Sequence, residues 1–309
     1  MTTEATKDTP IGFVGLGHMG GNMAARYLDA GYQVSGEAMS RDEAQGLVEQ
    51  GLSWRPTPRA LAESAEIVFT SVPDDEVLRQ VASGPDGILA GLGAGKTWID
   101  VSTVSPRASR ELAEQVRGTG AVMLDAPVSG SVPQVQAGTL TIMVGGDSRA
   151  YEGVEQLLRV LGTPTHVGAN GQGLILKLAI NISLAVQVLA LSEGLLIAER
   201  DGIDRELALE VMTASPIGSP MLKARVPLVL ELPEDAWFDV GLMHKDIRLA
   251  LEAAAELNVP VPSTRAAEAV LGRAGELGYE HRDIAAIFEV LGKIEGTPGT
   301  TTVPAALAG

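Results

Sequence analysis

The chain of 309 residues has no cysteine, few aromatic side chains and an excess of acidic over basic residues. The lack of thiols excludes disulfide bonds, thiolate nucleophiles and cysteine-ligated metals. Aromatic residues make up 4% of the chain and apolar residues 45%, so aliphatic side chains must fill a sizeable core. The formal net charge of −16 argues against binding to nucleic acid or to an anionic membrane, because both attract basic surfaces.

Signals for metal binding and for membrane targeting are also missing. The histidines show no metal-ligand spacing, so we expect no metal; they are His18, His166, His244 and His281. Residues 1–10 are polar and lack the apolar core of a signal peptide. The apolar run at 171–202 contains polar and charged residues that favour a buried helix over a membrane span, namely Lys177, Asn181, Gln187 and Glu193. We therefore expect a cytoplasmic protein.

A glycine-rich turn follows the first apolar segment. A short strand at 11–14 runs into a G-x-G-x-x-G turn, and a helix and a second strand come after it. Gly15 allows the tight turn, Gly17 lets the backbone approach a pyrophosphate, and Gly20 permits close packing of helix on strand. In this order of elements the pattern predicts dinucleotide binding, with the helix N-terminus facing the phosphates. The alternative is a purely structural glycine turn.

Strands and helices alternate through the first half of the chain, which predicts the α/β class. After the first unit we expect strands at 65–72, 97–101, 121–125, 140–144 and 165–167, and helices at 75–82 and 106–118. Residues 1–169 are therefore predicted to form a Rossmann-type, doubly wound sheet. Loops that leave the carboxyl ends of parallel strands line the ligand crevice, and here these are residues 72–73, 102–103 and 126–131.

The second half of the chain is predicted to be an all-helical domain over residues 170–295, followed by a disordered tail over 296–309. A long helix between Gly171 and Gly202 opens this domain. Further helices are expected at 205–213, 221–230, 242–257, 262–275 and 283–291, the last capped by Asp283. Because the long helix is apolar around most of its circumference, we expect a partner subunit to cover part of it, in a homodimer or homotetramer.

Two polar residues stand out in the first turns of the long helix. Lys177 and Asn181 are four positions apart, so an ammonium and an amide share one face. Lys177 either extends to water or to a carboxylate, or it projects into a cleft where a lowered pKa makes it a general acid or base. The helix alone leaves both interpretations open.

Several sequence blocks together resemble the β-hydroxyacid dehydrogenase family, whose members include 3-hydroxyisobutyrate dehydrogenase and tartronate semialdehyde reductase. The blocks are Gly12-Phe-Val-Gly-Leu-Gly-His-Met-Gly20, Asp100-Val-Ser-Thr-Val-Ser-Pro106, Asp125-Ala-Pro-Val-Ser-Gly-Ser-Val-Pro133 with Ala137-Gly-Thr139, and Gly171-x-Gly-x-x-x-Lys177-x-x-x-Asn181. A fifth similarity is Phe238-x-x-x-Leu-x-x-Lys245-Asp246. The resemblance extends over about residues 11–291.

The resemblance implies an NAD(P)-dependent oxidoreductase that moves a hydride between nicotinamide and a small β-hydroxy acid or its semialdehyde. It implies that Lys177 is the general acid/base and that Asn181 helps to orient the substrate. The implied substrate-binding residues are Ser102, Ser129, Gly130 and Ser131. The implied cofactor-binding residues are Gly15, Leu16, Gly17, His18, Met19, Gly20, Ser40, Arg41, Val72, Pro73, Val77, Thr103 and Lys245.

Two departures from the family pattern concern the substrate. Ser131 stands where the family commonly has a second glycine, and Ile180 where it commonly has an asparagine. Alternative functions are an imine reductase or reductive aminase and a non-catalytic dinucleotide-binding protein. Both would be expected to lack Lys177, so its presence favours chemistry on hydroxy and oxo acids.

The choice between NAD and NADP depends on the residues after the second strand. A carboxylate there usually binds the adenosine ribose, but Glu37 is one position early and the neutral Ala38 takes its place. If Glu37 faces the ribose, it repels a 2′-phosphate and favours NAD. If it turns away, Ser40 and Arg41 are left to bind that phosphate. We expect a slight preference for NADP.

Overall fold

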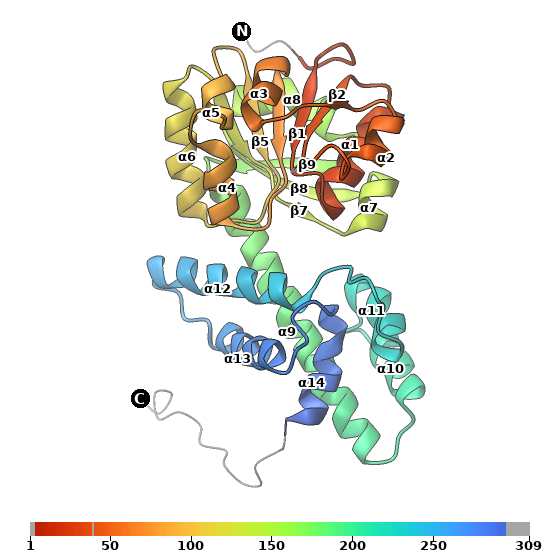
Figure 1. Ribbon diagram of the computed structural model, residues 1–309. Helices are drawn as coiled ribbons and strands as arrows, with labels where there is room; N and C mark the ends of the chain where they lie inside the picture. The colour runs from red at the N-terminus through yellow and green to blue at the C-terminus, as the bar shows by residue number, and fades with distance from the viewer. Residues whose placement is uncertain (1–3, 39, 295–309) are drawn as a thin grey trace. The chain divides into compact units, whose positions relative to one another are not determined.

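The computed structural model describes residues 4–38 and 40–294 and divides into two compact units (Figure 1). The first unit comprises Met1–Ser183 and Lys245–Thr264, and the second comprises Leu184–His244 and Arg265–Gly309. The division therefore falls within three helices, each of which contributes residues to both units. The expected boundary at residue 169 follows the order of the chain and stays a prediction. The expected tail, 296–309, lies outside the described residues.

The first unit is built on one sheet with the strand order β3-β2-β1-β4-β5-β6-β8-β7, and β9 pairs with β8. The strands are β1 (Ile11–Val14), β2 (Val34–Glu37), β3 (Ser53–Trp54), β4 (Ile67–Thr70), β5 (Thr97–Asp100), β6 (Val122–Asp125), β7 (Val128–Ser129), β8 (Leu140–Gly146) and β9 (Gly162–Gly168). The helices are α1 (His18–Asp29), α2 (Gln45–Glu49), α3 (Pro58–Ser64), α4 (Asp75–Ala82), α5 (Ile88–Gly91), α6 (Pro106–Gly118), α7 (Val132–Ala137) and α8 (Ser148–Leu158).

Both faces of this sheet are covered, as a doubly wound fold requires. Phe69 and its neighbours on one face pack against α1, α7 and α8, and Phe13 stacks on Phe69 with ring centroids 4.7 Å apart. Val68 and Trp98 on the other face pack against α3, α4, α5 and α6. The strands are thus apolar on both sides, which explains why they appear in the sequence as continuous apolar runs.

The predicted α/β fold is confirmed, and the structure adds short elements and two reversed strands, β8 and β9. The sheet is parallel from β3 to β6, but β8 runs antiparallel to β6 and to β7. β9 pairs parallel with β8 and therefore shares its reversed direction. α2, α3, α5, α7, α8, β3 and β7 were not predicted. Most of these are short, and α8 (Ser148–Leu158) was missed although its length gives it a full amphipathic pattern.

The second unit is helical. Three helices are shared with the first unit. α9 (Gln172–Arg200) and α13 (Pro262–Glu276) begin in the first unit and end in the second, whereas α12 (Val240–Glu256) begins in the second unit and ends in the first. The remaining elements are α10 (Arg205–Ala214), α11 (Pro220–Leu230), the 3-10 turn η1 (Ile284–Ala286) and α14 (Ile287–Lys293). Leu195 and Leu209 lie in their shared core. Asp283 caps η1 by accepting a hydrogen bond from the backbone N–H of Ala285 at 3.0 Å, as the sequence predicted.

The long helix is only partly covered by its own chain. α9 is long and apolar enough to cross a membrane, and 39% of its most apolar window is buried. Length and composition of one helix are weak evidence for a membrane span, and core helices of soluble proteins share them.

Candidate active site

The glycine turn after β1 has the geometry of a phosphate-binding turn. Gly15 has a φ of +88°, and a Cβ there would lie 2.3 Å from the Ser71 carbonyl oxygen. A Cβ on Gly20 would lie 2.0 Å from the Gly15 carbonyl oxygen, so α1 approaches the turn too closely for a side chain. Gly17, the N-cap of α1, has open space where its Cβ would be. This open position at a helix N-terminus fits the approach of a pyrophosphate.

The end of β2 lies next to this turn. Glu37 pairs in register with Val14, and its carbonyl oxygen accepts a hydrogen bond from the Gly15 N–H at 3.3 Å. Burial, and secondarily the nearby Glu43 carboxylate, raises the pKa of Glu37. Ser40 accepts a hydrogen bond from the Glu43 N–H at 3.3 Å, and Arg41 is exposed. The loop therefore offers both an acidic and a basic group to an adenosine ribose.

The loops after β4 and β5 are joined by side chains. The Ser102 hydroxyl is buried and accepts a hydrogen bond from the Val72 N–H at 3.0 Å. Asp75, at the start of α4, accepts two hydrogen bonds from Ser105, from its N–H at 2.7 Å and from its hydroxyl at 2.6 Å. These contacts join the loop that contains Val72 and Pro73 to the loop that contains Thr103, as one frame. Ser102 contributes to this frame, and its expected contact with substrate stays a prediction.

The end of β6 fixes the start of α9. The buried Asp125 carboxylate accepts hydrogen bonds from the N–H groups of Gly171 at 2.7 Å and Leu174 at 3.2 Å. A Cβ on Gly173 would lie 2.4 Å from the Met143 carbonyl oxygen, so the first turn of α9 packs directly on the sheet. Lys177, one turn beyond Leu174, is therefore carried by a helix whose start is anchored at a strand end.

The expected carboxylate-binding loop follows Asp125 in the chain. Ser129 ends β7 and is half-buried, and Gly130 has a φ of +131°. A Cβ on Gly130 would lie 2.7 Å from the Leu140 side chain. The N–H and the hydroxyl of Ser131 both bond the Gln134 side-chain oxygen, at 2.9 and 3.0 Å. Ser131 thus caps α7, which accounts for a serine where the family commonly has a glycine.

Lys177 and Asn181 lie beside a buried carboxylate from α12. The Asn181 side-chain amide donates a hydrogen bond to Asp246 at 2.6 Å, and these side chains are 1% and 2% exposed. Lys177 is half-buried, and among the described residues its ammonium has neither a hydrogen-bond nor an ion-pair partner. Burial lowers the pKa of Lys177, Asp246 opposes that shift, and Lys245 adds to it.

Lys245 links this group to the loops of the sheet. Its ammonium lies 3.1 Å from an Asp246 carboxylate oxygen and donates hydrogen bonds to the carbonyl oxygens of Pro73, at 2.7 Å, and Thr103. The structure therefore brings Lys177, Asn181 and Lys245 together with the strand-end loops. Ser129–Ser131 share a loop, and in the part of the chain that the structure describes no hydrogen bond joins them to Lys177. Arg41 and Ser40 lie at the separate β2 end.

Two carboxylates of the site were missed in the sequence. Asp246 appears in the sequence only as the last residue of the fifth block of similarity. Its spacing from Met243 and Ala250 places it on the buried face of α12, so the apolar period carries a signal for it. Asp125 binds residues 46 positions or more away, and no local pattern predicts such a contact.

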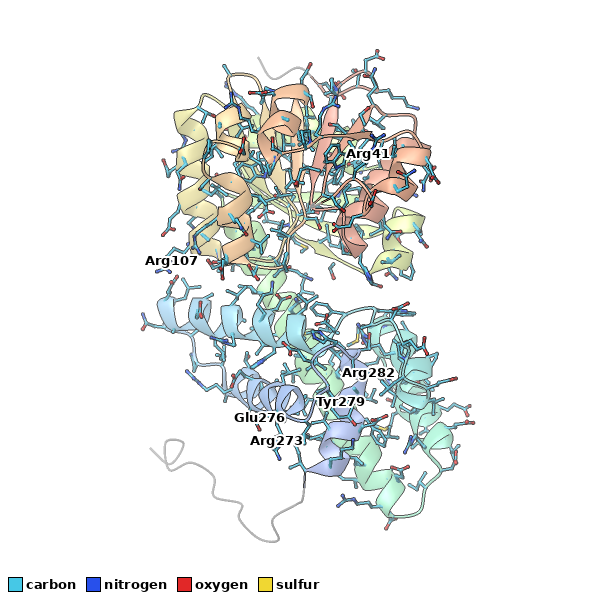
Figure 2. The ribbon with its side chains drawn as sticks, viewed as in Figure 1. Arg41, Arg107, Arg273, Glu276, Tyr279 and Arg282 are labelled. Carbon is cyan, nitrogen blue, oxygen red and sulfur yellow. The ribbon has the colours of Figure 1, made fainter. Side chains whose placement is uncertain are left out.

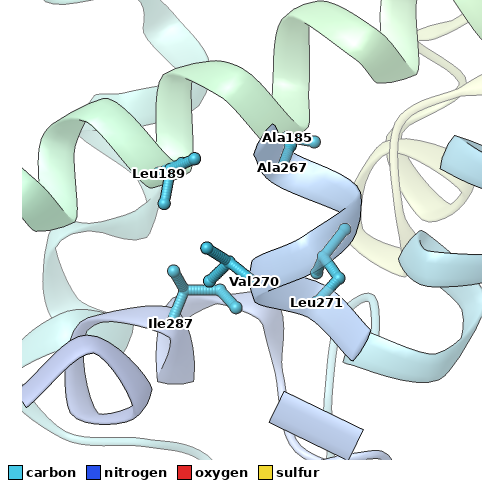
Figure 3. A pocket seen from close by; sticks show the side chains of 6 residues that line it. All are labelled: Ala185, Leu189, Ala267, Val270, Leu271 and Ile287. Carbon is cyan, nitrogen blue, oxygen red and sulfur yellow. The ribbon is translucent and has the colours of Figure 1, made fainter. Parts of the chain in front are cut away.

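A small cavity elsewhere has no such chemistry. It lies in the second unit, and the side chains lining it in Figure 3 are all apolar: Ala185, Leu189, Ala267, Val270, Leu271 and Ile287. Among the described residues no cluster of acidic and histidine side chains could hold a metal ion.

Comparisons with known proteins agree with this geometry. Residues 10–171 match the NAD-binding domain of 6-phosphogluconate dehydrogenase, and residues 171–291 match the NAD-binding domain of NADP-dependent 3-hydroxyisobutyrate dehydrogenase. The chain is 33% identical over 292 residues to 2-(hydroxymethyl)glutarate dehydrogenase of Eubacterium barkeri, covering 94% of this chain and 97% of that protein.

Two further relatives extend the comparison. 2-Hydroxy-3-oxopropionate reductase of Escherichia coli (strain K12) is 33% identical over 282 residues, covering 91% of this chain and 96% of that protein. The crystal structure of a 3-hydroxyisobutyrate dehydrogenase from Salmonella typhimurium superposes with a TM-score of 0.84 at 26% identity, covering 92% of this chain and 100% of the other.

The phosphate-binding turn, the doubly wound sheet and the helical second unit define an oxidoreductase that uses NAD or NADP. The chain belongs to the β-hydroxyacid dehydrogenase family.

Proposed function

We propose that the protein transfers a hydride between nicotinamide and a small β-hydroxy acid or its semialdehyde, with Lys177 as the general acid/base. The observation that carries this proposal is the half-buried, unpartnered ammonium of Lys177, set beside Asn181 on a helix anchored at a strand end. Burial lowers the pKa of Lys177 toward neutral pH, and proton transfer is most efficient when the pKa lies near the working pH.

Bound NAD or NADP supplies or accepts the hydride. In the oxidation direction the neutral Lys177 amine takes the proton of the substrate hydroxyl as the carbinol C–H bond breaks. In reduction the Lys177 ammonium returns a proton to the carbonyl oxygen. Asn181, one turn beyond Lys177 on α9, positions the substrate beside that amine.

The proposed cofactor site uses the turn at Gly15–Gly20 for the pyrophosphate and the loops containing Val72 and Thr103 for the rest of the dinucleotide. The open position at Gly17 supports this assignment. Lys245 holds two of these loops through their carbonyl oxygens and carries a positive charge beside them.

The proposed substrate is an acid with oxygen on the carbon β to its carboxylate. The names of the two similar enzymes describe such compounds, one a hydroxymethyl acid and one a 3-oxo acid. We assign the carboxylate to the loop at Ser129 and Gly130, because loops after strand ends bind ligands in this fold. Ser129→Ala should raise the KM for an acid substrate by about 5- to 30-fold, the equivalent of about 1–2 kcal/mol. An unchanged KM would place the carboxylate elsewhere.

The experiment that tests the function is a panel of short β-hydroxy acids and semialdehydes assayed by cofactor absorbance with NAD and NADP, and with cyclic imines alongside. Turnover of a hydroxy acid and its semialdehyde supports the proposal. Turnover of imines alone would favour an imine reductase, and cofactor binding without any turnover would favour a non-catalytic protein.

We also propose that the enzyme is a cytoplasmic homodimer or a larger homo-oligomer. Large apolar side chains at the end of α9 and along α10 are exposed in the single chain, with Ile197 72%, Val211 60% and Leu207 52% exposed. A second copy that covers these side chains would remove them from water. The polar interruptions of α9 and the net charge of −16 support a soluble form; recovery of the activity in the membrane fraction would contradict it.

A further inference from the structure

Asp246 is a buried carboxylate to which the proposed reaction assigns no role. It is 2% exposed and belongs to α12. Its oxygen Oδ2 accepts the Asn181 amide at 2.6 Å, and Oδ1 lies 3.1 Å from the Lys245 ammonium without a hydrogen bond of good geometry. An isolated buried carboxylate costs several kcal/mol, so Asp246 depends on these partners to remain ionised.

The contact with Asn181 determines how its amide is oriented. An ionised carboxylate only accepts hydrogen bonds, so the Asn181 nitrogen must face Asp246. The Asn181 oxygen Oδ1 is therefore directed elsewhere, and it is buried without a partner among the described residues. A buried amide with one fixed end and one unpaired oxygen is preorganised for a further donor.

The same carboxylate interacts electrostatically with two ammonium groups, those of Lys177 and Lys245. Asp246 raises the pKa of Lys177, and Lys245 lowers it. Burial raises the pKa of Asp246, whereas Lys245 and Lys177 lower it. Both charges that act on Lys177 come from α12, and α9 itself has no other ionisable side chain from Gln172 to Ser192.

We propose that Asp246 is a positioning residue, which fixes the Asn181 amide and supplies the counter-charge of Lys177. This inference rests on the proposed role of Lys177. The competing interpretation is a helix-surface ion pair between Lys245 and Asp246, which would stabilise the fold and leave the reaction unaffected. The burial of Asp246 and its short bond to Asn181 argue against that interpretation.

The test is the pH profile of kcat for Asp246→Asn at saturating cofactor and substrate. Asparagine keeps the shape and removes the charge, so the pKa of Lys177 should fall. The limb of the profile should then move to lower pH in both directions of the reaction. Because the new amide also releases Asn181, kcat at the optimum should fall by about 10- to 100-fold, as expected for misplacing a group that orients substrate.

The matched control is Asp283→Asn in the second unit. Asp283 is also fully buried and bonds a cation, the Arg225 guanidinium, at 2.8 Å. Loss of the Asp283 charge should lower the melting temperature and leave the limb of the pH profile of kcat unchanged. Lys245→Met tests for a displacement of the pH profile in the opposite direction. Lys245 is partly exposed and lowers the pKa of Lys177, so its removal should move the limb of the profile to higher pH.

Opposite displacements in Asp246→Asn and Lys245→Met, with none in Asp283→Asn, support the proposal. A limb that stays in place in Asp246→Asn overturns it, even if kcat falls. If Asp246→Asn does not fold, an unmoved limb in Lys245→Met overturns it instead. Lys177→Ala distinguishes a failure of the proposed function from a failure of this inference. Normal turnover in that variant refutes the proposed function. Lost turnover in Lys177→Ala, with the limb of the pH profile unmoved in Asp246→Asn, refutes the role of Asp246 alone.

Discussion

At the scale of single residues, the site depends on how side chains are desolvated. Lys177 alone in water would be protonated and inactive as a base near neutral pH. On α9 its half-buried ammonium lies near one carboxylate and one further ammonium, and burial is the largest influence on its pKa. The chemistry therefore comes from the environment of the lysine rather than from the residue type.

The pH dependence of the reaction follows from this shift. Because the pKa of Lys177 is lowered, the neutral amine becomes available below the pH at which an ordinary lysine loses its proton. Oxidation should speed up as pH rises through this pKa, and reduction should slow down through the same range. Profiles of kcat/KM in both directions check this. A limb at the value of a free lysine, about 10.4, would contradict it.

Cofactor preference also depends on single side chains. Figure 2 shows Arg41 on the loop beyond β2, away from Arg107 at the start of α6. If Arg41 binds a 2′-phosphate, Arg41→Ala should lower kcat/KM for NADP by about 10-fold or more and leave NAD nearly unchanged, because a charged hydrogen bond is lost. Arg107→Ala, which removes an exposed arginine elsewhere, should change neither. If the parent enzyme prefers NAD, this preference would indicate that Glu37 binds the adenosine ribose and that Arg41 does not bind a 2′-phosphate.

At the scale of elements, the sequence allowed the long and periodic segments to be predicted but not every segment between them. α4 and α6 were predicted with their observed ends, because Asp74 and Ser105 cap them and the apolar periodicity is clear. β3 and β7 are too short to show a period. β8 runs antiparallel to β6, and no local sequence pattern specifies the direction in which two strands pair.

The site was predicted to a similar extent. The glycine turn and Lys177 carry local signals, and the resemblance to a family placed the others. The network of Asp125, Asp246 and Lys245 joins residues far apart in the chain, so only the fold could assemble it.

Two glycines of the first turn have different roles: Gly20 allows close packing, and Gly17 leaves room for a ligand. Gly20→Ala places a Cβ against backbone and should destabilise the protein by about 1–3 kcal/mol or more. Gly17→Ala meets no atom within 4 Å and should leave the melting temperature nearly unchanged. It should nevertheless weaken cofactor binding, because the new methyl group occupies the proposed pyrophosphate position. Thermal unfolding and cofactor titration measure the two effects. Equal destabilisation by both substitutions would contradict the assignment.

At the scale of the whole molecule, the single chain leaves apolar surface uncovered. Leu207 and Val211 lie one turn apart on α10, and Ile197 lies near the end of α9. Ile197→Glu with Val211→Glu should convert a dimer into a monomer in light scattering, since two charges at the centre of an apolar contact oppose association. Leu257→Glu, at an equally exposed leucine elsewhere, should keep the parent's size. A monomeric parent would contradict the proposed assembly.

The central claim is that this oxidoreductase moves its proton through Lys177, and the most direct measurement is the turnover of Lys177→Ala at saturating cofactor. We expect kcat to fall by about two to four orders of magnitude, as for the loss of a positioned acid–base group. The cofactor dissociation constant should change little, because the phosphate-binding turn is untouched. Near-normal turnover of Lys177→Ala at neutral pH would contradict the account.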